Sequence, residues 1–186
     1  MVKKKIDKYH LTIYSLDTEI GRLYCYFSRK GLFQMLLDED LSISKDKKAC
    51  IKVFKLNEVE KEMQKLCEIN YQILKYELTG YFNKEKIKFT VPLDMSFYSE
   101  FQLKVLNQLL QIPYGSVNSY KQIAESIGNP KASRAVGNAV GSNRTLIIIP
   151  CHRVIKFDGN AGWFGGKGVG TELKKRLLLY EGLKLN

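Results

Sequence analysis

The sequence predicts an α/β (α+β) protein in two parts, a small antiparallel three-stranded sheet with helices and then a mostly helical domain. Two patterns lead to this prediction. From Tyr9 to Leu37 apolar residues alternate with a period of two, as in strands that bury one face, and after Ser99 they recur at helical spacing. The 186 residues suffice for one domain or two small ones, and we place the boundary in the extended segment 88–93, giving domains 1–92 and 93–186.

The first domain is expected to be a scaffold. Turn-forming residues at 17–19 and 29–31 divide the apolar segment into three strands, joined as an antiparallel meander. Asn57 is a candidate helix N-cap, and apolar residues spaced by about 3.6 over residues 56–78 predict two helices that cover the sheet. No residues in this half indicate chemistry.

Capping residues predict three helices early in the second domain, beginning at Ser99, Ser119 and Asn129. The two serines each have a glutamine three residues later, which completes a capping box. The second and third helices are separated by a tight turn at Gly128, a pattern typical of the helix-turn-helix motif. A last helix is predicted over residues 171–181.

The formal net charge of +11 indicates an anionic partner, and the second half carries most of it. Residues 95–186 hold 12 basic and 5 acidic side chains, against 18 and 14 in residues 1–94. The helix after Gly128 consists mainly of small residues and offers chiefly Arg134 and Asn138 to a partner. Small residues would permit close approach to a DNA backbone in a narrow groove, but they could equally serve packing within the protein.

Several classes of protein are not expected. No apolar run approaches the ~20 residues of a membrane span, and no signal-peptide apolar region follows the basic start, so we expect a cytoplasmic protein without a membrane partner. The four cysteines show no C-x-x-C spacing, and only two histidines accompany them. We therefore expect neither a metal site nor a cofactor.

Cys151 is the candidate nucleophile. It follows three isoleucines at 147–149 and Pro150, which we expect to form a strand, and it precedes His152 and Arg153. Imidazole and cationic neighbours lower a thiol pKa from about 8.5 and so favour the reactive thiolate. The alternative is a buried, inert cysteine at the end of a core strand.

A thiolate in a basic helix-turn-helix domain indicates chemistry on a nucleic acid. A base that carries an alkyl group on oxygen is a softer electrophile than a phosphate. That base would have to be flipped out of the duplex, and Arg134 is placed to fill the gap. Once Cys151 carries a thioether, nothing in the chain is placed to remove it, so the protein would act once.

The motifs resemble those of one family. They comprise the segment Pro150-Cys151-His152-Arg153-Val154, the pair Ser119-Tyr120, and the residues 128–137. Together they resemble the methylated-DNA–protein-cysteine methyltransferases, also called 6-O-alkylguanine-DNA alkyltransferases, over about residues 88–182. The resemblance implies a ribonuclease H-like first domain and a winged helix-turn-helix second domain. It also implies a monomer that binds the minor groove of duplex DNA and irreversibly transfers the alkyl group of 6-O-alkylguanine, and of 4-O-methylthymine, to its own cysteine.

The resemblance further implies roles for individual residues. Cys151 would accept the alkyl group, His152 would take the thiol proton through a water, and Glu181 would orient His152. Asn143 would brace the loop before the nucleophile. Tyr120 would rotate the nucleotide phosphate and support the flipped guanine, while Arg134 would intercalate in its place. Further DNA contacts are expected from Lys121, Asn129, Ser133, Asn138, Arg153 and Phe157, and the guanine pocket from Val154, Trp163, Phe164 and Gly165.

Two other functions fit parts of the sequence. A helix-turn-helix regulator could recognise DNA or damage without chemistry, although the cysteine at 151 favours transfer. A thiol hydrolase could use Cys151 and His152, but adjacent side chains rarely form a thiolate–imidazolium pair, and no oxyanion-hole motif is visible.

Overall fold

The computed structural model describes residues 11–38, 61–85, 88–162 and 170–184. The chain divides into two compact units, Met1–Asp94 and Met95–Asn186. Both mix helices with short strands, as the sequence predicts. Within the described residues, no helix is both long enough and apolar enough to cross a membrane.

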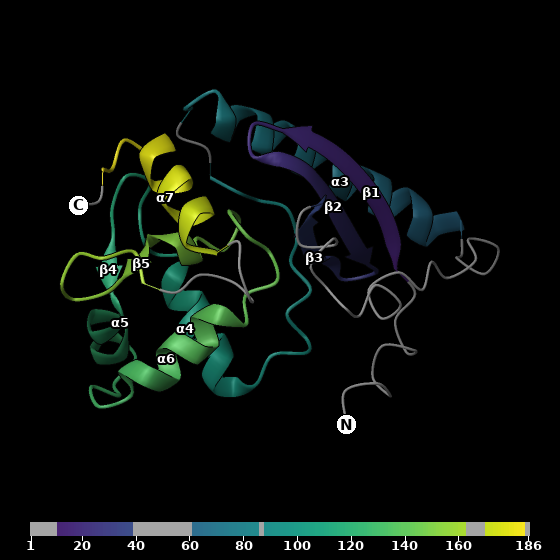
Figure 1. The fold of residues 1–186 in the computed structure, drawn as a ribbon. Coiled ribbons are helices and arrows are strands. Elements are labelled where there is room, and N and C mark those ends of the chain that lie inside the picture. The colour runs from purple at the N-terminus through teal and green to yellow at the C-terminus, as the bar shows by residue number, and fades with distance from the viewer. Residues whose placement is uncertain (1–10, 39–60, 86–87, 163–169, 185–186) are drawn as a thin grey trace. The chain divides into compact units, whose positions relative to one another are not determined.

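The first unit contains the predicted three-stranded meander (Figure 1). The strands β1 (Thr12–Thr18), β2 (Gly21–Ser28) and β3 (Gly31–Leu37) pair antiparallel in the order β1-β2-β3. Leu23, Cys25 and Phe27 alternate along β2 and are fully buried, which confirms the period-two pattern and gives the sheet one core face.

A glycine lets the chain return to this sheet. Gly31 has a φ of +133°, and a Cβ there would lie only 2.2 Å from the Pro92 carbonyl oxygen. Leu32 donates its backbone N–H to that oxygen over 2.7 Å, and its own carbonyl accepts from Asp94 over 2.9 Å. Only glycine permits this close approach, which joins the end of the unit to its sheet.

One helix, α3 (Lys61–Phe82), packs along all three strands (Figure 1). The prediction of two helices is wrong over these residues, and the predicted cap Asn57 lies outside the described residues. The buried Glu77 fastens the following segment to α3, since its carboxylate accepts from the backbone and hydroxyl of Thr90, each over 2.6 Å.

The second unit is mainly helical. Its helices are α4 (Glu100–Leu109), α5 (Tyr120–Ser126), α6 (Ser133–Gly141) and α7 (Gly170–Tyr180), with a 3-10 turn, η3 (Cys151–Arg153). The two strands β4 (Asn118–Ser119) and β5 (Val154–Ile155) pair in parallel. This short pair holds the two residues before α5 beside the two residues after η3, with Asn118 opposite Val154 and Ser119 opposite Ile155.

The helix starts test the capping predictions. Ser99 and Ser119 each form a complete capping box with the glutamine three residues on, as predicted. The predicted cap at Asn129 is wrong, because α6 begins only after Ala132, without a side-chain cap bond. Asn129 instead accepts from the Ala132 backbone over 2.9 Å and closes the turn between α5 and α6. Helices α5 and α6 pack together across this turn, so the helix-turn-helix arrangement is present; its wing remains a prediction.

The expected strand before Cys151 is absent. The three isoleucines at 147–149 lie in turns rather than in a ladder, although all are at least 97% buried. Ile147 has a φ of +71°, a left-handed conformation that is strained for a β-branched residue. Burial alone produces the same apolar run in a strand and in a buried loop, which explains the error.

Candidate active site and DNA-binding surface

Asn143 connects the loop to the candidate nucleophile. Its side-chain amide nitrogen lies 2.9 Å from the Cys151 sulfur and also donates to the Ile149 carbonyl over 2.9 Å. Its amide oxygen accepts from the Thr145 backbone N–H over 3.0 Å. The loop therefore forms part of its backbone hydrogen bonds within itself and part with the Asn143 side chain, which also donates to the sulfur.

Burial changes the expected ionisation of Cys151. The thiol is only 6% exposed, and burial raises its pKa, which the Asn143 hydrogen bond and the charge of Lys174 oppose. The expectation that its neighbours give a lowered pKa is therefore wrong for the resting protein. The thiol is protonated at neutral pH, and reaction requires a base to remove its proton.

His152 and Glu181 form a buried pair. The His152 Nε2 lies 2.7 Å from Glu181 Oε1, and both side chains are fully buried. The pKa of Glu181 is lowered to about 2. Burial alone would raise this pKa, but hydrogen bonds from His152 and Arg153 lower it by more. Burial lowers the His152 pKa, so the ring is neutral at neutral pH. Because an ionised carboxylate can only accept, Nε2 carries the proton and Nδ1 is the free basic nitrogen.

Arg153 belongs to this buried network and not to a DNA surface. Its guanidinium donates to both oxygens of Glu181 over 2.9 Å, and to the Ile112 carbonyl over 2.7 Å. The residue is only 8% exposed. The predicted DNA contact by Arg153 is therefore a mistake: the arginine joins η3, the end of α7 and the segment after α4, while Gly115 donates a further backbone hydrogen bond to Glu181.

Sequence reasoning missed Lys174. This lysine of α7 is fully buried, donates from Nζ to the Val154 carbonyl, and lies 5.8 Å from the ring centroid of Tyr120. The pKa of Lys174 is lowered to about 8. Burial lowers it, and the nearby Cys151 partly opposes this shift. The available signal was the position of a lysine on the apolar stripe of α7, between Leu173 and Leu177.

Tyr120 begins α5 at a crowded point. Gly137 of α6 faces its ring, since a Cβ there would lie 3.9 Å away, and a Cβ at Gly162 would lie 3.3 Å from its hydroxyl. Burial raises the pKa of Tyr120, so the phenol stays protonated at neutral pH. Two glycines and a lysine therefore fix the tyrosine near Cys151.

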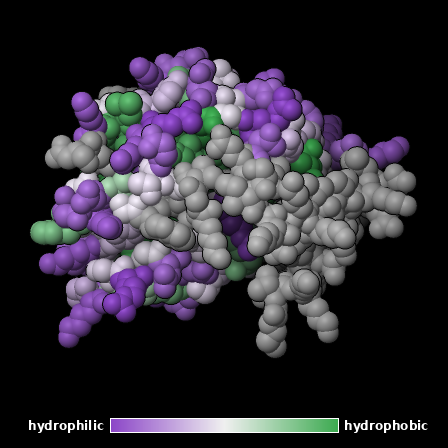
Figure 2. Space-filling view, in the orientation of Figure 1, coloured by the Kyte–Doolittle hydropathy of each residue, from purple (hydrophilic) through white to green (hydrophobic). Residues whose placement is uncertain are grey.

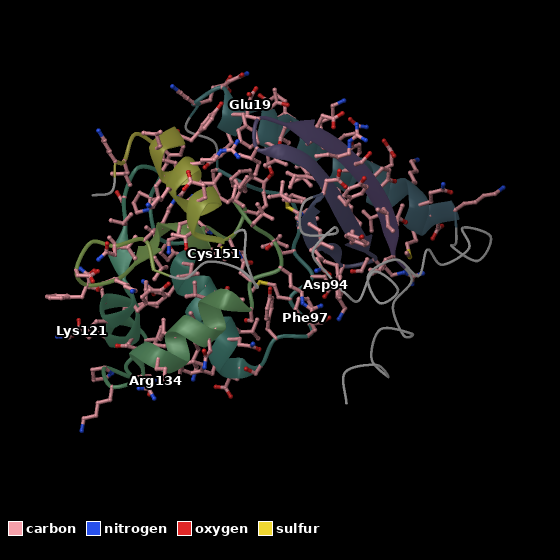
Figure 3. The ribbon with its side chains drawn as sticks, in the orientation of Figure 1. Glu19, Asp94, Phe97, Lys121, Arg134 and Cys151 are labelled. Atoms are coloured by element: carbon pink, nitrogen blue, oxygen red, sulfur yellow. The ribbon has the colours of Figure 1, made fainter. Side chains whose placement is uncertain are left out.

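The exposed face of α6 is small and carries one long cation. Arg134, Ala135, Asn138 and Gly141 are exposed, whereas Val136, Ala139 and Val140 are buried. Figure 3 places Arg134 and Lys121 at the outer edge of this unit and Cys151 inside it. In Figure 2, hydrophilic side chains cover much of the face over α5 and α6. Some small residues of α6 therefore pack inside the protein, and others lie on its outer face, where no long side chain except that of Arg134 projects from the helix.

The remaining predicted contacts lie in different places. Phe157 is 88% exposed and lines a surface hollow together with Lys121. Asn129 is exposed, and Ser133 is half-buried at the start of α6. Val154 is fully buried. The predicted pocket residues Trp163, Phe164 and Gly165 lie outside the described residues.

Comparison with known proteins matches this arrangement. Residues 100–183 match the model of the 6-O-methylguanine DNA methyltransferase, DNA binding domain. The methylated-DNA–protein-cysteine methyltransferase of Sulfurisphaera tokodaii is 41% identical over 58% of this chain and 65% of its own length, so the chain spans just under two thirds of that relative. The namesake of Saccharolobus islandicus is 42% identical over 59% of this chain and 68% of its own length.

The fold extends the similarity across both units. The crystal structure of Mycobacterium tuberculosis OGT in complex with DNA matches with a TM-score of 0.67 and 34% identity, covering 90% of each chain. Fold and site together define an α/β protein in which a helix-turn-helix unit encloses a cysteine beside a buried histidine–glutamate pair. The chain belongs to the family of methylated-DNA–protein-cysteine methyltransferases.

Proposed function

We propose that the chain repairs DNA by moving a methyl or larger alkyl group from 6-O-alkylguanine, and from 4-O-methylthymine, onto Cys151. The observation that carries this proposal is the chain of contacts through the site. Asn143 holds the sulfur, while Glu181 holds His152, the residue next to the nucleophile. This arrangement resembles the nucleophile, base and orienting carboxylate of hydrolases, but here the nucleophile would attack the saturated carbon of an alkyl group.

The buried pair indicates how the thiol loses its proton. The free Nδ1 of His152 accepts it, through a bridging water, and the adjacent carboxylate of Glu181 stabilises the imidazolium that results. The sulfur then attacks the alkyl carbon, forming the C–S bond as the C–O bond breaks. The guanine leaves as an anion and takes up a proton, and the imidazolium of His152 gives up the proton that it took from the thiol, so that no net proton is gained or lost. The thioether has a poor leaving group, so each molecule acts once.

The helix-turn-helix surface is proposed to bind duplex DNA from the minor groove. The low outer face of α6 would allow the backbone of the protein to approach the groove closely. Arg134 would fill the gap left by the flipped base, and Tyr120 would rotate its phosphate. Lys121, Asn129, Ser133, Asn138 and Phe157 would contact the surrounding DNA. The DNA complex of the Mycobacterium tuberculosis relative supports the choice of partner.

Other parts of this proposal rest on the resemblance. Val154 and residues 163–165 would line the guanine pocket. Residues 1–92 would support residues 93–186, which carry the DNA-binding and transfer site. The protein would act as a cytoplasmic monomer.

The intact mass of the protein tests the transfer. After incubation with a duplex that contains one 6-O-methylguanine, we expect each molecule to gain one methyl group and no more. The Cys151→Ala variant should bind the same duplex and gain nothing, and an unmethylated duplex should leave the wild-type mass unchanged. Full binding of the methylated duplex without any mass change would contradict the proposal and favour a non-catalytic DNA-binding protein.

A further inference from the structure

Lys174 is a buried cation that the proposed chemistry does not use. Its side chain is fully buried on α7, and its Nζ donates to the carbonyl of Val154, which directly follows η3. The ring of Tyr120 covers it, with 5.8 Å between Nζ and the ring centroid. The lysine therefore lies between the 3-10 turn that carries Cys151 and the first residue of α5.

Packing does not explain this lysine. Removing an ammonium from water costs several kcal/mol, which its polar partners in the protein have to offset. An apolar side chain of similar length would fill the same volume without this penalty. The carboxylate of Glu181 is held by Arg153 and His152. The group that interacts electrostatically with Lys174 and can still become negative is Cys151.

We propose that Lys174 serves the transfer through Cys151, by supplying the positive charge that stabilises the thiolate once His152 has taken the thiol proton. This inference rests on the proposed function. Lys174 keeps its own proton and makes no bond to the substrate. It acts only through Cys151, by placing a positive charge near the sulfur. Its effect requires the protonated form, because a neutral amine offers no charge to the sulfur.

This role gives the thiol an unusual dependence on pH. Among the described residues, Cys151, His152 and the phenol of Tyr120 interact with Lys174. Burial makes His152 neutral and keeps Tyr120 protonated at neutral pH, so neither replaces the charge of Lys174. Thiolate therefore accumulates with rising pH until Lys174 begins to lose its proton near pH 8. Above that pH, Lys174 releases its proton more readily than Cys151 does, and the loss of its charge makes the thiolate less favourable. The reactivity of Cys151 therefore levels off with rising pH before it rises again.

The test measures the thiol without DNA. A haloacetamide is reacted with the wild type, with Lys174→Met and with Lys175→Met, an exposed neighbour on α7 that serves as the matched control. Mass spectrometry of the peptide that contains Cys151 gives its rate constant from pH 6 to pH 10. Circular dichroism confirms that each variant is folded.

The wild type and Lys175→Met should show the levelling-off near pH 8. Lys174→Met should lose it and react at least about tenfold more slowly at pH 7, which corresponds to a rise of one unit in the thiol pKa. A purely structural role would lower the rate by the same factor at every pH, and that result would overturn the inference. A wild-type profile that rises without levelling off would overturn it even if Lys174→Met did not fold. Because this assay contains no DNA, its outcome is independent of the mass assay with methylated duplex.

Discussion

The side-chain amide of Asn143 donates to both the sulfur of Cys151 and the carbonyl of Ile149, each over 2.9 Å. A single group therefore sets the position of the nucleophile and the conformation of the loop that precedes it. The hydrogen bond to sulfur is strongest when the sulfur is negative, since charge-assisted hydrogen bonds are about twice as strong as neutral ones.

Replacing Asn143 with alanine should weaken both reaction and fold. We expect a loss of about 2 kcal/mol in the free energy of unfolding, because the hydrogen bonds of Asn143 to the Ile149 carbonyl and from the Thr145 backbone N–H are both lost. The single-turnover rate of methyl transfer should fall at least about tenfold, in proportion to the lost stabilisation of the thiolate. Urea unfolding and quenched-flow transfer assays measure the two effects. Asn107→Ala, at an exposed position on α4, is the control and should change neither.

The stability of the protein should depend on Glu181 in acid. Its pKa is about 2 in the folded protein, against an ordinary value of 4.5, so its contribution is complete above pH 4.5 and is lost as the pH falls towards 2. The difference corresponds to about 3 kcal/mol. The lowered pKa of His152 acts in the same direction, since protonation of the unfolded chain below about pH 6.5 also favours unfolding.

Glu181→Gln provides the comparison. It should lose about 3–5 kcal/mol of unfolding free energy at pH 7, because the guanidinium of Arg153 stays buried without its counter-charge. Its stability should then fall less steeply between pH 4.5 and 2 than that of the wild type, because the titration of Glu181 no longer contributes. Glu172→Gln, an exposed position in the first turn of α7, should keep the wild-type pH dependence. Parallel curves for Glu181→Gln and the wild type would show that the carboxylate is not the titrating group.

Arg134→Ala should separate duplex repair from chemistry. The side chain is exposed on the outer face of α6, so its removal should leave the unfolding free energy within about 0.5 kcal/mol of the wild type. Transfer from a methylated duplex should slow at least about tenfold, since extruding a base costs a few kcal/mol that the arginine would offset. Transfer from the free base, 6-O-methylguanine, should keep its rate. Equal losses on both substrates would remove Arg134 from the flipping step.

Lys121 and Arg153 should behave differently although both were predicted to contact DNA. Lys121→Ala should weaken DNA binding for all sequences and lower the slope of log affinity against log salt by about 1. Arg153→Lys should leave that slope unchanged but lower stability, because an ammonium cannot reproduce the forked contacts with Glu181 and Ile112. Fluorescence anisotropy at several salt concentrations measures the slopes. A reduced slope for a folded Arg153→Lys would restore its predicted DNA contact.

The sequence predicted the parts of the fold that depend on local pattern. The meander from β1 to β3 follows from alternation, and the starts of α4 and α5 follow from serine–glutamine capping boxes. The loop before Cys151 was predicted as a strand because burial, not pairing, determines its isoleucines. Its backbone is hydrogen-bonded partly within the loop and partly to the side chain of Asn143, and no local sequence pattern indicates such contacts.

In the candidate site, too, the sequence predicted the local features and missed the long-range contacts. The motif around Cys151 predicted the candidate nucleophile and its neighbour His152, since these residues are adjacent in the sequence. Arg153 is among the DNA contacts expected from the resemblance, whereas the structure pairs it with Glu181, which lies 28 residues further along the chain. Lys174 was missed because a lysine among leucines is ordinarily an exposed residue. Long-range partners of charged groups thus required the structure.

The network around Glu181 also concerns the order in which the protein is made. Its carboxylate, 29 residues after His152, is bonded to His152, to Arg153 and to the backbone of Gly115. Domains generally fold from the N-terminus as the chain is synthesised. A nascent chain that already contains Cys151 therefore lacks the carboxylate that holds His152 until α7 has emerged, and during translation the thiol of Cys151 lies in an unassembled site.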